Sequence, residues 1–276
     1  MNILLPVSND PSFKDAVSLA IDVAKAQEGE IRIVYVIDQD EIRRIESGGG
    51  LSAIHMAQHA AEEYGKRKME EATGILLETI QTCAQGGVQA HGEIREGEPS
   101  KELLSAAGGC DLVAAAIASH FDPQLEDKPG RLVLSMMNDG GIPVLMACTP
   151  YRPVRTVVVG CGGKTKTERV VGAMTKLSLW KTGIRMILLA VDDSAEEGRM
   201  RLVASRNLLS DAGYPPWEER VVPGRRLETF SAFCEKENAD LVVLGGWGEH
   251  RWDDLMGLSL TGRLLEEGRR NLFLYM

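Results

Sequence analysis

Short apolar runs alternate along the chain with segments whose apolar residues recur every three or four positions. The run ILLPV at residues 3–7, for example, precedes a segment in which Ala16, Leu19, Ala20 and Val23 share one helical face. A short apolar run is typical of a buried strand, and the 3.6-residue spacing is typical of an amphipathic helix. Strands that alternate with helices indicate a parallel sheet with right-handed crossovers and helices on both faces. The pattern therefore predicts an α/β protein.

This pattern occurs twice, which indicates a duplication. The strand, helix and strand that begin at Asn2 have a counterpart that begins at Arg155. Further along, GEPSKELLSAAGGCDLV at residues 97–113 parallels PGRRLETFSAFCEKENADLV at residues 223–242, and both lead into a strand that starts with Asp-Leu-Val. IPVLMAC closes the first copy and NLFLYM closes the second. We therefore expect two similar domains in tandem.

The two copies are joined by TPYRPVR at residues 149–155, and its two prolines are typical of a linker. We predict domains at residues 1–149 and 154–276, each with the order β-α-β-α-β-α-β-α-β. The first copy is longer between its second and third strands. There the sequence predicts a loop with three glycines at 48–50 and a helix from about Leu51 to Ala84, charged on one side and apolar on the other. The loop is either a plain connection or a gate.

The composition limits the classes of partner. The chain has 276 residues, of which 44% are hydrophobic and 26% are charged, and its net charge is −9. This acidic balance argues against a broad nucleic-acid surface, although backbone N–H groups can still hold a small anion. No apolar run approaches the ~18 residues of a membrane span, and the first residues lack a signal-peptide pattern. A cytoplasmic protein with neither membrane nor nucleic-acid partners is expected.

Taken together, these segments resemble the universal stress protein family. The resemblance rests on ILLPVS and VVVGCG as first strands, on the two runs that end in Asp-Leu-Val, and on IPVLMA as a closing strand. It covers nearly the whole chain as two tandem domains. It implies that each half is a flavodoxin-like (adenine nucleotide alpha hydrolase-like) five-stranded parallel sheet. It also implies that PVLMA and NLFLYM pair within the chain as a pseudo-dimer, since they would otherwise be unprotected edges. A homodimer of two chains is a further expectation.

Members of this family that bind ATP or AMP do so at the carboxyl ends of the strands. Their signature is Gly-x-x-Gly, nine residues, then Gly-Ser or Gly-Thr, with an Asp after the first strand. In the second half Gly245 and Gly248 match the first glycine pair, Leu258 and Ser259 stand at the final two positions, and Gly162 stands at the Asp position. Glycines let phosphate approach the backbone, and a helix N-terminus supplies N–H groups. The resemblance thus implies a nucleotide site, with the backbone of Val191 toward adenine, formed by Gly160, Cys161, Gly162, Val191, Leu244, Gly245, Gly248, Leu258, Ser259, Leu260 and Thr261.

The first half departs further from this signature. Ala116 and Ser119 replace the leading glycines, and Arg131 takes the hydroxyl position. Ser8 replaces the Asp after the first strand, with Asp10 nearby. Arg131 is either a guanidinium that pairs with phosphate or a surface arginine. We expect the first site to be weak or absent for ATP.

Two other phosphate-binding motifs are incomplete in the turn after VVV. Residues 163–165, Gly-Lys-Thr, resemble the end of a P-loop, but Val158 stands where the first P-loop glycine belongs. Gly160 and Gly162, with Asp192 after the next strand, partly match a dinucleotide fingerprint in which Thr165 replaces the third glycine. NAD-type binding is therefore the weaker alternative.

Metal and thiol chemistry have little support in the sequence. The five cysteines form no CxxC pair, which argues against a disulfide framework or a zinc site. His55 and His59 are spaced i, i+4 and either share a metal or lie on a solvated helix face, but the stretch HMAQH lacks the glutamate of HExxH. Cys161 is either a thiol activated by a helix N-terminus or a small packed side chain. No metal and no catalytic residues are predicted.

The sequence therefore predicts a stress-response protein of the universal stress type that binds and regulates rather than catalyses. Its expected ligand is ATP or AMP in the second domain. The alternative is a ligand-free interaction or scaffold protein whose nucleotide sites have decayed. A slow ATPase is a third hypothesis, and it lacks an acidic residue or metal position in both first turns, because Ser8 and Gly162 replace the Asp.

Overall fold

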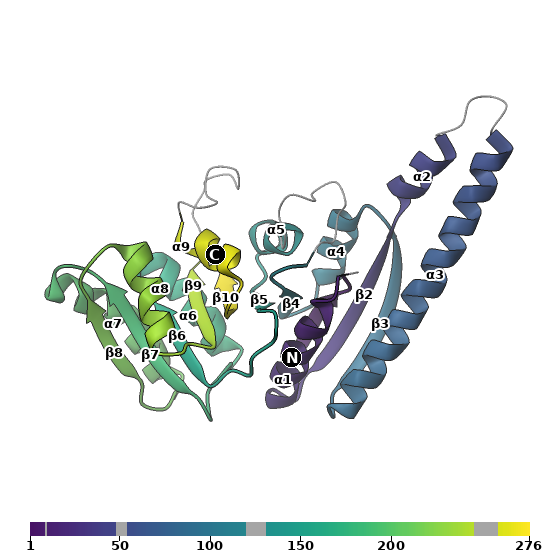
Figure 1. Ribbon diagram of the computed structural model, residues 1–276. Helices are drawn as coiled ribbons and strands as arrows, with labels where there is room; N and C mark the ends of the chain where they lie inside the picture. The colour runs from purple at the N-terminus through teal and green to yellow at the C-terminus, as the bar shows by residue number, and fades with distance from the viewer. Residues whose placement is uncertain (9, 48–53, 120–130, 246–258) are drawn as a thin grey trace.

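The computed structural model of the chain describes residues 1–8, 10–47, 54–119, 131–245 and 259–276 (Figure 1). The first half contains β1 (Asn2–Pro6), α1 (Phe13–Ala26), β2 (Glu30–Asp38), α2 (Gln39–Ser47), α3 (Ile54–Gln85), β3 (Gln89–Gly97), α4 (Pro99–Ala107), β4 (Leu112–Ala116), α5 (Arg131–Gly140) and β5 (Val144–Ala147). The second half contains β6 (Thr156–Gly160), α6 (Lys164–Lys176), β7 (Arg185–Val191), α7 (Ala195–Asp211), β8 (Glu218–Val222), α8 (Arg226–Lys236), β9 (Leu241–Gly245), α9 (Leu260–Glu267) and β10 (Asn271–Tyr275). The predicted α/β class is confirmed, and the second half has the predicted strand–helix order, whereas the first half has one helix more, α2.

All the strands belong to one ten-stranded sheet with the order β3-β2-β1-β4-β5-β10-β9-β6-β7-β8. The five strands of each half run parallel to one another, as predicted. The halves meet where β5 and β10 pair antiparallel, with Met146 opposite Leu272 and Val144 opposite Leu274. The two closing strands therefore protect each other's edges, and the expected intrachain pseudo-dimer is a continuous sheet.

Helices cover both faces of this sheet, and each face has its own core. Buried residues of α1, α3, α6 and α7 pack on one face, and buried residues of α4, α5, α8 and α9 pack on the other. Burial on both faces explains why the central strands are nearly continuous apolar runs. Strand β4 (LVAAA), for example, is buried at all five positions.

The insertion in the first half contains a helix that the sequence analysis did not predict. Helix α2 covers QDEIRRIES, which is mostly charged, and it packs along α3. Figure 1 shows α2 and the start of α3 extending away from the sheet. The predicted long helix is confirmed as α3, whereas the three glycines at 48–50 lie outside the described residues. None of the described helices is long and apolar enough to cross a membrane.

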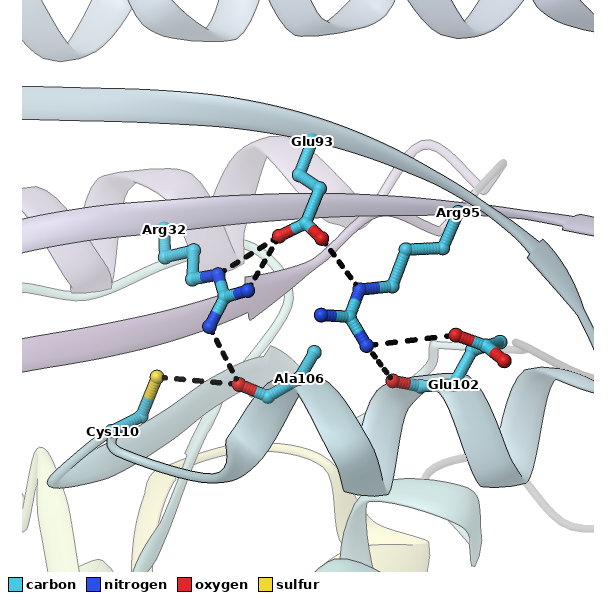
Figure 2. A network of polar contacts seen from close by, with 6 residues as sticks. All are labelled: Arg32, Glu93, Arg95, Glu102, Ala106 and Cys110. Carbon is cyan, nitrogen blue, oxygen red and sulfur yellow. Dashed lines mark hydrogen bonds and ion pairs between the residues drawn. The ribbon is translucent and has the colours of Figure 1, made fainter.

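The outer part of the first half is held by charged side chains. Glu93 on β3 lies between two arginines (Figure 2). It accepts hydrogen bonds from Arg32 on β2 at 2.6 and 3.0 Å and from Arg95 at 2.7 Å. The same arginines donate to α4, to the carbonyl oxygens of Ala106 at 3.1 Å and Glu102 at 3.2 Å. This network fixes α4 over strands whose facing side chains are polar.

Two aspartates show the duplication at atomic level. The Asp240 carboxylate accepts hydrogen bonds from the backbone N–H groups of Arg155 at 3.1 Å and Thr156 at 3.0 Å. In the first half, Asp111 accepts from the N–H of Asn2 at 2.8 Å. Each aspartate precedes the fourth strand of its half and caps the start of the first. The repeated Asp-Leu-Val motif therefore has a structural role.

Candidate functional site

The carboxyl ends of β6 and β9 form the topological switch point of the second half. From β6 the chain crosses to β7 and β8 on one side, and it then returns to β9 and β10 on the other. Strands β6 and β9 are direct neighbours, with Val159 opposite Val243. Open α/β sheets bind ligands at such a point, outside the carboxyl ends of the strands. The structure thus brings Gly160–Gly162 close to Leu244 and Gly245, with Val191 at the end of the neighbouring β7.

Gly160 is explained by packing. A Cβ on this residue would lie 2.4 Å from Cδ2 of Leu244 and 3.1 Å from Cε2 of Phe230. Leu244 and Phe230 are both buried in the core beneath α8 and α9. A larger residue would have to displace them, so packing favours glycine at this position with or without a ligand.

Gly245 allows a helix to approach the end of β9. A Cβ here would lie 2.6 Å from the carbonyl oxygen of Lys166 and 2.7 Å from its Cβ. Lys166 is in the first turn of α6, so that turn sits directly against the end of the strand. Since the N-cap residue Gly163 has no side chain to bond to them, the first N–H groups of α6 have no side-chain cap. They point toward the same edge of the sheet.

A serine hydroxyl stands at the start of α9. Ser259 is the N-cap of α9, and its Oγ accepts a hydrogen bond from the N–H of Gly262 at 3.0 Å. Its hydroxyl hydrogen can still be donated to another group. Leu260 packs against the core and Thr261 is buried. Two of the predicted residues, Gly248 and Leu258, lie outside the described residues.

Two arginines at this edge were missed by the sequence analysis. The Nη2 atom of Arg226 lies 1.2 Å from the point where a Cβ on Gly162 would stand. Arg201 on α7 donates to the carbonyl oxygen of Gly162 at 2.5 Å and to the Asp192 carboxylate at 2.7 Å. The position at which family members with nucleotide carry an Asp is thus covered by guanidinium groups. The basic pair in PGRR, which follows β8, was the available signal.

Comparison with known protein families gives a match in the first half of the chain. Residues 1–120 match the Universal stress protein family. These residues are similar to a universal stress protein domain. No curated protein matches the chain.

Solved structures extend the fold comparison to the whole chain. A universal stress protein from Archaeoglobus fulgidus DSM 4304 matches with a TM-score of 0.73 at 17% identity, over 99% of this chain and 95% of that one. A putative universal stress protein from Pseudomonas aeruginosa UCBPP-PA14 matches with a TM-score of 0.57 at 13% identity, over 99% of this chain and 92% of that one. These identities show a shared fold. Together with the family match, they support the tandem arrangement inferred from the duplication.

In the N-terminal half, the corresponding polar groups are engaged with one another. Ser119 is buried, and its Oγ accepts from the N–H of Ala116 at 3.2 Å, at the end of β4. Asp10 accepts hydrogen bonds from the hydroxyls of Ser8 and Ser12. Arg131 begins α5, and its side chain lies outside the described part.

The thiol of Cys161 is packed in the core of the second half. The residue is 1% exposed, and its Sγ lies 3.2 Å from Oγ of Ser205. Burial raises the pKa of Cys161 to about 12, so the thiol stays protonated at neutral pH. Of the two interpretations of this cysteine, the structure favours the packed side chain over the activated nucleophile.

The alternative metal and dinucleotide interpretations gain no support. In the described ranges no three His, Cys, Asp or Glu residues are grouped as metal ligands would be. The exposed His59 has Glu63 as an acidic neighbour, at 3.8 Å. The Asp192 carboxylate, which a dinucleotide site would use for ribose, is paired with Arg201 and also accepts from the N–H of Ser194 at 3.0 Å.

Proposed function

We propose that the second half binds an adenine nucleotide, ATP or AMP, at the carboxyl ends of β6 and β9, and that the protein is a non-enzymatic regulator of a stress response. One observation carries the proposal. The turn at Gly160–Gly162, the end of β9 at Gly245 and the Ser259-capped start of α9 all belong to the same edge of the sheet, at its switch point. Backbone N–H groups and a hydroxyl are the donors that phosphate needs.

A ligand-free scaffold is the second candidate, and a specific observation favours it. Gly160 and Gly245 are explained by their contacts with Leu244 and Lys166, and Arg226 covers the position of the Asp. A decayed site would keep glycines of this kind because the fold needs them. The two candidates are therefore separated by measuring binding, since the glycines are required in both.

Isothermal titration calorimetry of the whole chain with ATP and with AMP tests the proposal. Gly163→Glu is the informative variant. A Cβ on Gly163 meets nothing within 4 Å, and its backbone is extended, so a side chain fits there. A carboxylate at the start of α6 opposes the helix dipole's attraction for phosphate and should weaken binding about tenfold, because like charges repel at short range.

Gly172→Glu is the matched control. Gly172 lies on the same helix, a Cβ there also meets nothing within 4 Å, and the net charge changes by the same amount. It stands about 13 Å farther along the helix axis. Binding that is unchanged in Gly172→Glu and weakened in Gly163→Glu supports the site. No heat of binding at millimolar ATP or AMP with the unmodified chain would favour the scaffold.

A further inference from the structure

The side chain of Arg226 lies over the β6–α6 turn and has no acceptor among the described residues. Its Nη2 stands 1.2 Å from the Cβ position of Gly162, so the guanidinium occupies the space above the glycine backbone. No group of the described residues accepts a hydrogen bond from it, and no carboxylate pairs with it. Arg226 is nevertheless exposed, so a solute can reach it.

A second guanidinium, that of Arg201, lies at this turn. Arg201 bonds to the carbonyl oxygen of Gly162 and to Asp192, which neutralises it. Surrounding protein atoms and the charge of Arg201 lower the pKa of Arg226, which remains a cation. The carboxylate of Asp193 is engaged by the backbone N–H of Gly224 at 2.9 Å. One positive charge is therefore left over.

The backbone around Arg226 also favours an anion. Helix α8 begins at Arg226, and its N-cap residue Arg225 makes no side-chain cap hydrogen bond. Helix α6 begins just after Gly162 and is likewise without a side-chain cap. By contrast, Ser194 caps the neighbouring helix α7 with its hydroxyl. The uncapped start of α6 therefore follows a glycine over which the unpaired guanidinium of Arg226 lies.

The described residues of the first half show no equivalent of this arrangement. By the pairing of the two repeats, Ser8 corresponds to Gly162, and Pro99 at the start of α4 corresponds to Arg226 at the start of α8. The unpaired cation therefore belongs to the second half alone and is not required by the fold.

We propose that Arg226, supported by Arg201, is a phosphate-recognition residue, and that the ligand of the second half places a phosphate group over Gly162. An arginine fork matches phosphate oxygens and forms charge-assisted hydrogen bonds with them. This inference deepens the proposed function by naming the group of the ligand that this turn receives. It rests on that function only for the identity of the whole ligand.

Titration of inorganic phosphate, followed by ³¹P NMR, tests the residue directly. The unmodified chain shows saturable broadening or shift of the phosphate signal. Arg226→Gln weakens that binding about tenfold or more, because it removes a charge-assisted contact. Arg225→Gln removes the same charge from the adjacent exposed residue. Its affinity for phosphate should stay within about twofold of that of the unmodified chain.

Gly162→Asp supplies an independent variant. Its carboxylate would stand beside Arg226 and Arg201 and pair with them, so phosphate binding is lost while the cation count is unchanged. Circular dichroism of each variant confirms the fold. Absence of phosphate binding to the unmodified chain, or equal binding in Arg226→Gln, overturns the proposal.

AMP and adenosine separate this inference from the nucleotide proposal. Arg226→Gln should weaken the binding of AMP about tenfold and leave the binding of adenosine unchanged, because only AMP carries the phosphate. If AMP does not bind but phosphate binds through Arg226, the nucleotide proposal fails and this inference stands. If AMP binds equally to both chains, this inference fails and the nucleotide proposal stands.

Discussion

Asn271, the first residue of β10, bonds through its side chain to Cys148, just beyond the end of β5. Its Oδ1 accepts from the N–H of Cys148 at 3.0 Å, and its Nδ2 donates to the carbonyl oxygen of Arg152 at 2.8 Å. Asn271 is fully buried. One side chain thus ties the linker between the two halves to the strand that joins their sheets.

Asn271→Ala should lower the free energy of unfolding by about 2–4 kcal/mol, because it leaves a donor and an acceptor of the linker unpaired. Urea denaturation followed by circular dichroism measures the change. Asn207→Ala, at an exposed position of α7, is the control and should be neutral or slightly stabilising. Equal effects of the two substitutions would show that the linker contacts contribute nothing.

Gly160→Ala should destabilise the unliganded chain by about 1–3 kcal/mol, since the added methyl overpacks the core against Leu244 and Phe230. The control is Gly172→Ala on α6, where a Cβ meets nothing within 4 Å; it should stabilise by about 0.5–1 kcal/mol. Thermal unfolding of both variants without nucleotide checks this. A neutral Gly160→Ala would mean that glycine is kept there for a ligand rather than for packing.

Most elements of the fold could be predicted from the sequence. The strand–helix alternation and the repeated Asp-Leu-Val motif were sufficient to predict two parallel five-stranded units, because periodicity reports burial directly. The pairing of β5 with β10 was implied by the family resemblance and is confirmed. Helix α2 was missed because QDEIRRIES is mostly charged and is helical through its contact with α3.

The sequence placed the candidate residues at one edge of the sheet but did not reveal the contacts that each of them makes. These residues follow the ends of β6, β7 and β9, and strand order alone places those ends together. The reason for each glycine depends on a neighbour distant in the chain, such as Leu244 for Gly160 and Arg226 for Gly162. No spacing rule connects the turn after β8 with the turn after β6, so Arg226 emerged only from the three-dimensional arrangement.

The buried thiol of Cys161 should make the protein less stable in alkali. Its folded pKa, about 12, is raised above the unfolded value of about 8.5. The contribution to stability is therefore fully present below about pH 8.5 and is lost as the pH rises toward the folded pKa, since only the unfolded chain releases the proton. Within that window each such thiol lowers the free energy of unfolding by about 1.4 kcal/mol per pH unit.

Cys161→Ser tests this because serine does not ionise in that range. Urea denaturation at several pH values above about 8.5 should show a shallower loss of stability in the variant, by about one proton. Ser178→Ala, a polar substitution outside the core, should keep the slope of the unmodified chain. An identical slope in Cys161→Ser and the unmodified chain would contradict the assignment of a buried, protonated thiol.

The network around Glu93 should stabilise the first half at neutral pH and weaken in acid (Figure 2). Partial burial alone would raise the pKa of Glu93, but hydrogen bonds from Arg32 and Arg95 lower it overall. A lowered carboxyl pKa gives stability that is present above the unfolded value of about 4.3 and is lost as the pH falls through the folded pKa.

Glu93→Gln should therefore destabilise the chain by about 1 kcal/mol at pH 7, a modest figure because both partners of the Arg32–Glu93 pair are partly solvated. The difference from the unmodified chain should shrink below about pH 4, where Glu93 itself becomes protonated. Glu70→Gln, at an exposed position of α3, is the control and should leave the free energy of unfolding unchanged both at pH 7 and below pH 4. Urea denaturation at both pH values provides the comparison. A deficit that persists undiminished in acid would mean that Glu93 acts through packing rather than through its charge.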